Sequence, residues 1–278
     1  MYFTGIGDEA SNSLDDQIQA HQELGWKHIE LRNIDGVCVT DLCDRSFEQV
    51  VEKVMDAGLA VSGFASQLCN WARPISIHPD IDIAELRRAI PRMQRMGCQY
   101  LRIMSYPNQD WPEEQWKEET LERLRKLADI AEDAGIKLAH ENCSGWGGKS
   151  PETMLEMIEE VNSPSLTLIW DTGNPVRFGD DPWDFYQQVK EHVEYIHIKD
   201  ARREDDGSIT YTYPGEGEGA VREVLADLKE RNFDGPVSIE PHLEAVIHEG
   251  SSGGSGEEAY RTYVEYGKKL MELVDSIE

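Results

Sequence analysis

The sequence predicts an α/β fold, a (β/α)8 TIM barrel formed by one domain that covers residues 1–278. Strand-like and helix-like segments alternate from one end of the chain to the other, and there are eight of each. No internal linker separates them. A chain of 278 residues is long for an ordinary domain but typical of a barrel. A doubly wound open sheet is the alternative arrangement of the same elements.

Short, largely apolar runs mark the predicted strands, which in chain order are Tyr2–Ile6, His28–Arg32, Ala60–Ala65, Tyr100–Met104, Lys137–Glu141, Thr167–Asp171, Tyr195–Lys199 and Val237–Glu240. Helical patterns follow them at Leu14–Leu24, Ser46–Ala57, Ile83–Met96, Glu113–Ala134, Pro151–Val161, Pro182–Val189, Val221–Arg231 and Glu257–Ile277. The first four helices each stop at a glycine, the residue that most often ends a helix: Gly25, Gly58, Gly97 and Gly135.

Two longer loops are expected on the face formed by the carboxyl ends of the strands. Ala201–Gly219 contains a turn, a β-prone stretch at Ile209–Tyr213 and a glycine-rich segment, Pro214–Gly219. His248–Gly256 is rich in Gly and Ser, which predicts a mobile loop that closes over a substrate. A tolerated surface insertion is the alternative for this second loop.

The chain is strongly acidic, with 54 Asp and Glu against 27 Lys and Arg and a formal charge of −27. Only 11 of the 27 basic residues are lysine. This balance predicts a halophilic surface, on which high salt screens self-repulsion; an ordinary acidic cytosolic enzyme is the alternative. In either case we expect no nucleic-acid partner, because binding to phosphates needs Lys and Arg.

The five cysteines show neither a disulfide framework nor a thiolate metal site. They are odd in number, and no Cys-x-x-Cys pair occurs among them. Reduced thiols in a cytoplasmic protein are therefore expected. The N-terminal residues lack a basic region followed by an apolar stretch, and no apolar run approaches 18 residues, so we expect neither secretion nor a membrane partner.

Four predicted strands end in residues of the kinds that bind metal ions. These are Glu141, Asp171, His197 and Glu240, in the segments Lys137–Asn142, Leu166–Asp171, Val193–Lys199 and Pro236–Glu240. Parallel strands joined by helices bring their carboxyl ends to one face, so the four side chains are expected to meet at one cation. Three carboxylates and one imidazole suit a divalent ion such as manganese or magnesium. Taken singly, each residue has a structural alternative: a salt bridge, a helix N-cap, a core histidine or a carboxylate paired with arginine.

These segments resemble the sugar phosphate isomerase/epimerase family of xylose isomerase-like TIM barrels, which includes ketose 3-epimerases, hydroxypyruvate isomerases and inosose dehydratases. The resemblance covers most of the chain and is strongest in His140–Gly148, Trp170–Asn174, Tyr195–Arg203, Pro214–Gly219 and Val237–His242. It implies that the four strand-end residues bind one divalent cation, with manganese expected first and magnesium or cobalt as alternatives. It also implies that Glu141 and Glu240 act as acid and base on opposite faces of a sugar or sugar derivative, and family habit suggests a homo-oligomer.

Such a cation keeps two positions for a substrate carbonyl and the adjacent hydroxyl, and it stabilises the enediolate that forms when the neighbouring carbon loses its proton. Return of the proton to the opposite face gives epimerisation, and return to the adjacent carbon gives isomerisation. We therefore expect a metal-dependent sugar isomerase or epimerase. A lyase or dehydratase that acts on an inosose or keto-sugar derivative is the alternative. A non-catalytic sugar-binding barrel is disfavoured because all four ligands are intact.

Residues around the cation are expected to select the reaction, and the candidates for substrate contact are Glu30, Arg102, His140, Trp146, Asn174, Lys199 and Arg203. Many relatives carry a histidine at the position of Asn174, where an amide can hydrogen-bond a hydroxyl but carries protons poorly. Arg203 could hold a hydroxyl or a phosphate, and Trp146 could stack on a sugar ring. A packed loop aromatic is the alternative for Trp146, and ion pairs at the barrel rim are the alternative for Glu30 and Arg102.

Two glycine-rich motifs do not support a nucleotide site. Gly145–Ser150 resembles the end of a P-loop, but Cys143 stands where its first glycine should be. Gly215–Gly219 follows no clear strand and carries acidic residues where a pyrophosphate would lie. Three-zinc endonucleases of the same superfamily need additional histidines, and Asn174 stands at one of those positions.

Overall fold

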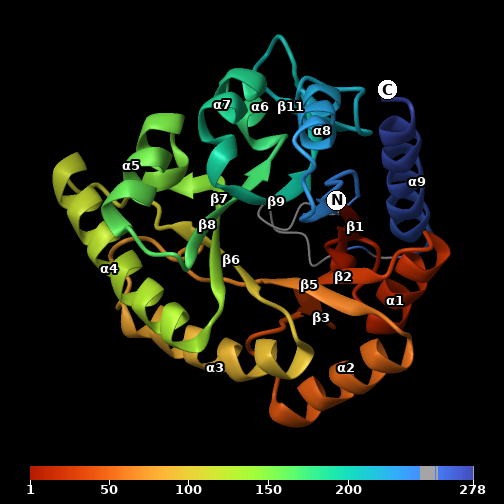
Figure 1. Ribbon diagram of the computed structural model, residues 1–278, viewed down its shortest axis with the longest axis horizontal. Coiled ribbons are helices and arrows are strands. Elements are labelled where there is room, and N and C mark those ends of the chain that lie inside the picture. The colour runs from red at the N-terminus through yellow and green to blue at the C-terminus, as the bar shows by residue number, and fades with distance from the viewer. Residues whose placement is uncertain (245–253, 255, 278) are drawn as a thin grey trace.

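The computed structural model describes residues 1–244, 254 and 256–277 and has the predicted barrel architecture (Figure 1). Eight parallel strands follow the spatial order β1-β12-β9-β8-β7-β6-β5-β2. The two end strands, β1 and β2, meet at a bridge between Ile6 and Glu30, which nearly closes the barrel. The bounds of the strands are β1 (Tyr2–Gly5), β2 (His28–Leu31), β5 (Ala60–Ala65), β6 (Tyr100–Ser105), β7 (Lys137–Gly145), β8 (Leu166–Asp171), β9 (Val193–Ile198) and β12 (Pro236–Ile239).

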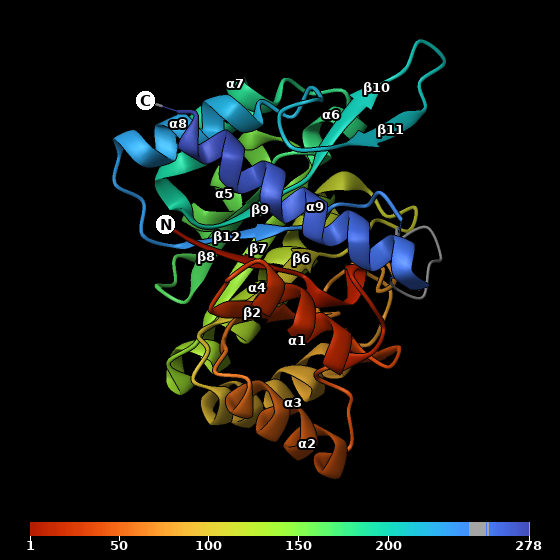
Figure 2. The same cartoon turned by 90° about the vertical axis from the view of Figure 1, so that its right-hand side faces the viewer.

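Helices surround this barrel, as Figure 1 shows from one end and Figure 2 from the side. Their bounds are α1 (Leu14–Glu23), α2 (Asp44–Asp56), α3 (Asp80–Met96), α4 (Glu113–Ala134), α5 (Pro151–Val161), α6 (Asn174–Phe178), α7 (Pro182–Val189), α8 (Val221–Glu230) and α9 (Gly256–Asp275). Gly97 and Gly135 end α3 and α4 in the left-handed conformation, with φ +69° each, which confirms the predicted stops. None of the helices in the described part of the chain is long and apolar enough to cross a membrane.

Several short elements were not predicted. They are the hairpin of β3 (Asn33–Ile34) and β4 (Val37–Cys38), helix α6, strand β10 (Asp200–Arg203), and the 3-10 turns η1 (Gly7–Glu9), η2 (Trp146–Gly148) and η3 (Lys190–His192). The β-prone stretch at Ile209–Tyr213 is confirmed as β11 (Ile209–Thr212), which pairs antiparallel with β10. The predicted mobile loop at His248–Gly256 lies outside the described residues, apart from Gly254 and Gly256.

The core has two parts, because successive residues of a strand face opposite sides of the barrel wall. The larger part lies between the wall and the helices and includes Leu138 of β7. The smaller part lies inside the barrel, where Ala139, Ile169 and Tyr195 form an apolar layer. This inner layer supports the polar side chains near the carboxyl ends of the strands.

The glycine-rich segment after β11 folds around the carboxylate of Asp200. The backbone N–H groups of Gly215 and Gly217 donate to Oδ2 at 2.8 and 3.0 Å, and those of Gly219 and Ala201 donate to Oδ1 at 2.9 Å each. A Cβ atom at Gly217 would lie 2.3 Å from Oδ1, so a side chain does not fit there. One buried carboxylate thus holds together the loop that follows the β10–β11 hairpin.

Candidate metal centre

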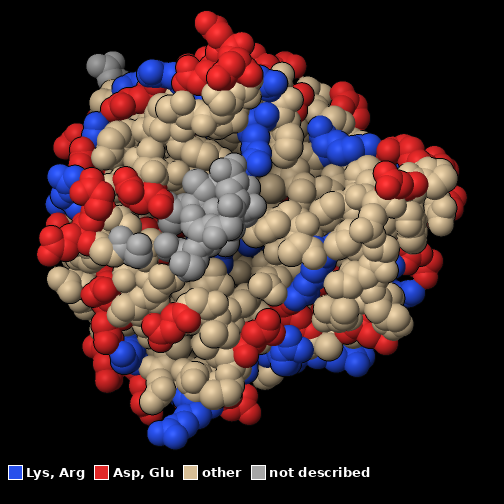
Figure 3. Space-filling view, turned by 180° about the vertical axis from the view of Figure 1, so that it is seen from behind, with Lys and Arg blue, Asp and Glu red and all other residues tan. Residues whose placement is uncertain are grey.

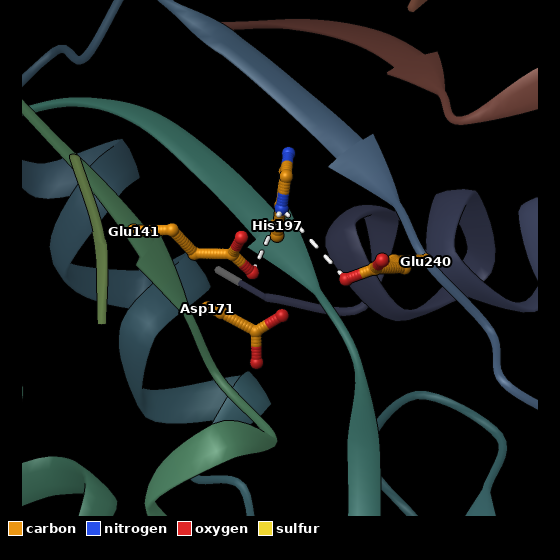
Figure 4. A group of neighbouring side chains, drawn as sticks. All are labelled: Glu141, Asp171, His197 and Glu240. Atoms are coloured by element: carbon orange, nitrogen blue, oxygen red, sulfur yellow. Dashed lines mark ion pairs between the residues drawn. The ribbon is translucent and has the colours of Figure 1, made fainter. Parts of the chain in front are cut away.

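Four side chains converge at the carboxyl end of the barrel, as the strand ends predicted (Figure 4). Glu141 lies on β7, Asp171 ends β8, His197 lies on β9 and Glu240 directly follows β12, and all four are buried. One candidate ligand atom from each lies within 4.8 Å of the other three. Nδ1 of His197 is 3.5 Å from Oε1 of Glu141 and 3.8 Å from Oε2 of Glu240.

The donor set fits a divalent cation. Nδ1 of His197 is buried and has no hydrogen-bond partner among the described residues, although it faces two carboxylates. A buried ring nitrogen without a partner lowers the stability of the fold unless it binds a proton or a metal ion. Three oxygen donors and one imidazole are a combination that suits hard and borderline divalent ions. These four residues therefore form a probable divalent-metal site.

The imidazole of His197 is oriented from below by Glu30. Nε2 of the ring lies 3.2 Å from each carboxylate oxygen of Glu30, and Oε2 of Glu30 also accepts from the hydroxyls of Tyr195 at 2.7 Å and Ser238 at 2.6 Å. A carboxylate behind a histidine directs its other nitrogen toward a metal. Glu30 was expected to contact substrate. In the structure it lies in the barrel interior against Nε2 of His197, on the side of the ring away from the other ligands.

Asp171 combines two of the roles that the sequence suggested for it. Its Oδ1 accepts the backbone N–H groups of Gly173 at 2.9 Å and Asn174 at 2.8 Å at the start of α6. Its Oδ2 lies 2.9 Å from Nζ of Lys199 and is left for the cluster. The side chain of Asn142 bonds both backbone groups of Asp171, at 2.6 and 2.9 Å, and so ties β7 to β8 at this point.

Three further side chains contact the ligands. Nζ of Lys199 lies 2.9 Å from Oε2 of Glu240 and 3.3 Å from Oδ1 of Asn174, whose Nδ2 donates to Oε1 of Glu141 at 3.3 Å. Nη1 of Arg102 is 3.5 Å from Oε2 of Glu141. The ligands are thus surrounded by donors that keep them ionised and fixed in place.

Arg32 accounts for a second group of candidate ligands. Glu9, Glu240 and His242 also bring donor atoms within 4.8 Å of one another. The guanidinium of Arg32 pairs with Oε1 of Glu240 at 2.8 Å, Oε1 of Glu9 at 3.1 Å and Oδ1 of Asp8 at 2.9 Å. A permanent positive charge therefore already neutralises these carboxylates, and we assign this group to an ion-pair network.

The two glutamates are held in their ionised forms. Burial raises the pKa of Glu141, but its contacts with His197 and Arg102 outweigh burial and lower the pKa to about 2. Burial acts on Glu240 in the same direction, and the attraction of Lys199 and neighbouring cations brings its pKa well below the usual range. Both carboxylates are therefore charged at neutral pH, as a metal ligand or a general base must be.

Asp171 and His197 shift in the opposite direction. Burial, together with the nearby Glu141 and Glu240, raises the pKa of Asp171 to about 6 against the attraction of Lys199. Burial lowers the pKa of His197, but the carboxylates of Glu30 and Glu141 outweigh burial and raise it to about 10. The cluster thus has a strong preference for positive charge at its centre.

A cavity of about 200 Å³ opens beside the centre, and its lining comprises Arg32, Trp71, Arg102, Met104, Glu141, Cys143, Ser144, Asn174, Arg177, Phe178, Lys199 and Glu240. Three of the expected substrate contacts, Arg102, Asn174 and Lys199, are in this lining. Trp71 was missed, because it lies in the loop after β5, where no strand-end pattern marks it. Its ring lies 5.9 Å from the Arg102 guanidinium, so an indole and a cation form one wall.

Three other expected contacts lie outside the cavity lining. His140 is on the opposite face of β7 from Glu141, where its Nε2 is 3.0 Å from the hydroxyl of Ser105. Trp146 is 2 % exposed, which leaves no ring face for a sugar. Arg203 is exposed on β10, and its guanidinium donates to the backbone oxygen of Arg177 at 3.4 Å. We therefore do not retain these three residues as substrate contacts.

Comparison with known proteins gives the site a context. A family model described as "Xylose isomerase-like TIM barrel" matches residues 18–270. A 2-epi-5-epi-valiolone 7-phosphate 2-epimerase from an Actinoplanes species is 29 % identical over 179 residues, which cover 63 % of this chain and 62 % of the relative. An inosose dehydratase from Clostridium botulinum is 25 % identical over 138 residues, which cover 45 % of this chain and 46 % of the relative.

Among solved structures, the IOLI protein with a bound zinc atom superposes with a TM-score of 0.76 at 20 % identity. That match covers 100 % of this chain and 99 % of the other, so it supports the fold over the whole length. The chain spans about half the length of the curated relatives that it matches, and 62 % of the epimerase. The sequence similarity is thus shared with proteins that carry out different reactions.

Proposed function

Because the chain belongs to the xylose isomerase-like TIM barrel family, we propose that it is a divalent-metal-dependent sugar isomerase or epimerase. In this proposal Glu141, Asp171, His197 and Glu240 hold one cation, with manganese preferred and magnesium or cobalt as alternatives. The substrate is a sugar or sugar derivative with a carbonyl next to a hydroxyl-bearing carbon.

One observation carries the proposal. Glu141 and Glu240 reach toward His197 from opposite sides, and both are buried and ionised (Figure 4). Two carboxylates on opposite sides of one centre allow one, in its ionised form, to take a proton from a carbon, and the other to return a proton on the far face after solvent has protonated it. This arrangement is what inversion of a stereocentre, or transfer of a proton between neighbouring carbons, requires.

The cation supplies electrophilic polarisation of a carbonyl when it is bound. The chain supplies the remaining functions. The carboxylates of Glu141 and Glu240 are the groups that accept and return the proton. The Lys199 ammonium and the Asn174 amide lie between them and offer hydrogen bonds to substrate oxygens. Trp71 offers an apolar ring face in the cavity lining.

A lyase acting on an inosose or a keto-sugar derivative is the second candidate. The similarity to an inosose dehydratase favours it. The same carboxylates would remove the proton, and departure of a hydroxyl from the next carbon would need a proton donor. Lys199 lines the cavity and could provide that proton, because its pKa is raised by Asp171 and Glu240 against the effect of burial and it therefore stays protonated.

Solvent-deuterium exchange tests the proposal. We expect the purified protein with Mn²⁺, given a panel of ketoses, inososes and keto-glycosides in D2O, to place deuterium on the carbon next to the carbonyl without loss of water. Product with a new double bond would instead identify the lyase. Exchange that continues unchanged after a chelator has removed all divalent metal would contradict both reactions.

The carboxylates provide the matched variants. Glu141→Gln and Glu240→Gln should each slow exchange about 10²–10⁴-fold, the usual contribution of a general acid or base. Glu194→Gln is the control, since Glu194 lies on the same barrel but at the amino end of β9, where it pairs with Lys137 at 3.1 Å. A near-normal rate in either of the first two variants would remove that residue from the acid/base role.

A further inference from the structure

Lys199 contacts two of the four proposed metal ligands with a single atom. Its Nζ is 2.9 Å from Oδ2 of Asp171 and 2.9 Å from Oε2 of Glu240. Of the two Glu240 oxygens, Oε2 is the one that lies near Nδ1 of His197, at 3.8 Å. The oxygens that face the centre of the cluster are therefore the ones that the ammonium engages.

The other cations of the site are placed differently. Arg32 engages Oε1, the outer oxygen of Glu240, and is fixed by Glu9 and Asp8. Arg102 contacts Oε2 of Glu141, at 3.5 Å, and its Nη2 donates to the carbonyl oxygen of Ser66, at 3.2 Å. Both guanidiniums thus contact oxygens on the outer side of the cluster. The Lys199 ammonium instead contacts Oδ2 of Asp171 and Oε2 of Glu240, which face its centre.

From this geometry we propose that Lys199 is a positioning residue that competes with the divalent cation for Asp171 and Glu240 and so sets the metal affinity. The inference rests on the proposed metal-dependent function. A carboxylate oxygen that would bind a divalent ion directly has less capacity left for a nearby ammonium, and the two positive charges would repel each other in a buried site. Metal binding therefore displaces the ammonium from these oxygens.

The cavity next to Lys199 can accept the displaced ammonium. Lys199 already lines the substrate cavity, and its four-carbon stem is flexible. The stem runs tightly past the backbone at Gly173, where a Cβ atom would lie 2.8 Å from Cγ of Lys199. Because Gly173 borders the stem on one side, we expect the ammonium to move along the cavity wall, where Nζ already lies 3.3 Å from Oδ1 of Asn174. Loading of the metal would in this way deliver a proton donor to the substrate side.

Calorimetric titration with Mn²⁺ tests the competition. We expect Lys199→Met to bind Mn²⁺ at least about tenfold more tightly than the unaltered protein, because a competing charge is removed. Lys137→Met is the matched control: Lys137 also lies on a barrel strand and pairs with a carboxylate, Glu194 at 3.1 Å, but at the amino end of the barrel. Its Mn²⁺ affinity should be unchanged. Equal or weaker binding by Lys199→Met would overturn the inference.

The outcomes separate this inference from the proposed function. If the unaltered protein binds no divalent ion, the proposed function fails; if it binds one equivalent but Lys199→Met gains no affinity, only the competition fails. Lys199→Gln, of similar length, replaces the methionine variant if that one does not fold. Acetylation of the unaltered protein adds a direct measure: Mn²⁺ should accelerate labelling of Lys199 and leave that of Lys137 unchanged, and slower labelling of Lys199 would count against displacement.

Discussion

His197 shows how a single residue acquires a role from its neighbours. Taken alone, a buried histidine on a strand is better explained as a satisfied core residue than as a ligand. Here Glu30 takes up one ring nitrogen at 3.2 Å, and the other is left facing Glu141 and Glu240. The ring orientation, and with it the ligand role, is therefore set by a carboxylate from β2 that never reaches the cavity.

Glu30→Gln tests this role. We expect Mn²⁺ affinity to fall about 10–100-fold, the usual cost of losing a carboxylate behind a metal-binding histidine. The amide keeps the size of the side chain but removes the charge that holds His197, so titration calorimetry should show weaker binding at one equivalent. Glu194→Gln is again the control, and an affinity within twofold of the unaltered protein would show that Glu30 is not needed to orient the ring.

At the residue scale, the sequence predicted what depends on strand ends. Asp171, His197 and the two glutamates follow from the rule that parallel strands present their carboxyl ends on one face. The structure places His140 and Trp146 outside the cavity lining, because proximity along the chain to Glu141 does not reveal which side of the wall a residue faces. Trp71 could not be found, since its position depends on the path of an irregular loop.

At the scale of elements, eight strands and their flanking helices were predicted, because each has an apolar period and several have glycine stops. The β3–β4 hairpin and α6 were not predicted. Both are shorter than the windows in which periodicity can be recognised. Helix α6 starts where Asp171 accepts the backbone N–H groups of Gly173 and Asn174, so a tertiary cluster, and not helix propensity, fixes its position.

Helix α1 is joined to the barrel and to α9 through a buried histidine. Nδ1 of His21 lies 2.8 Å from the carbonyl oxygen of Gln17, and Nε2 lies 3.2 Å from both the Gly5 oxygen and the Tyr263 hydroxyl. Burial lowers the pKa of His21 from 6.5 to about 4, against the effect of its backbone hydrogen bonds. The unfolded chain therefore binds a proton between pH 6.5 and 4 that the folded chain does not, and stability falls as the pH drops through this window.

Urea unfolding at several pH values tests this coupling. The lowered pKa of His21 corresponds to about 3 kcal/mol of stability that the unaltered protein loses between pH 7 and 4. His21→Gln lacks this group, so its free energy of unfolding should fall by about 3 kcal/mol less over the same pH range. The variant is expected to be less stable at pH 7, and the slope with pH is the quantity that matters. His192→Gln, at an exposed position, should leave the slope unchanged. Parallel curves for His21→Gln and the unaltered protein would contradict the coupling.

For the whole molecule, charge is the dominant feature. Acidic side chains surround the face seen in Figure 3, with basic ones between them. A formal charge of −27 makes the folded chain repel itself, and salt reduces this repulsion. The acidic excess is read directly from the sequence, whereas the four cations that line the cavity, Arg32, Arg102, Arg177 and Lys199, come together only through the fold.

Thermal unfolding in KCl tests the consequence of this charge. If screening of the repulsion raises the free energy of unfolding by about 1 kcal/mol, the Tm should rise by about 2–4 °C between 0.05 and 1 M KCl. The rise should level off near 1 M, where the Debye length is about 3 Å. A Tm that is flat over this range would exclude self-repulsion as a burden on the fold, and a rise that continues steeply above 1 M would indicate a salt effect other than screening.

The loop that closes around Asp200 has a consequence for how this face of the barrel keeps its shape. Glycine amides turned inward in this manner commonly surround a phosphate or another dissolved anion. Here the anion is the side chain of Asp200, which is part of the same chain. Its effective concentration at the amides is independent of what the solution contains. The conformation of this loop at the carboxyl end of the barrel is therefore stabilised by a carboxylate of the chain itself, and no dissolved anion is needed to stabilise it.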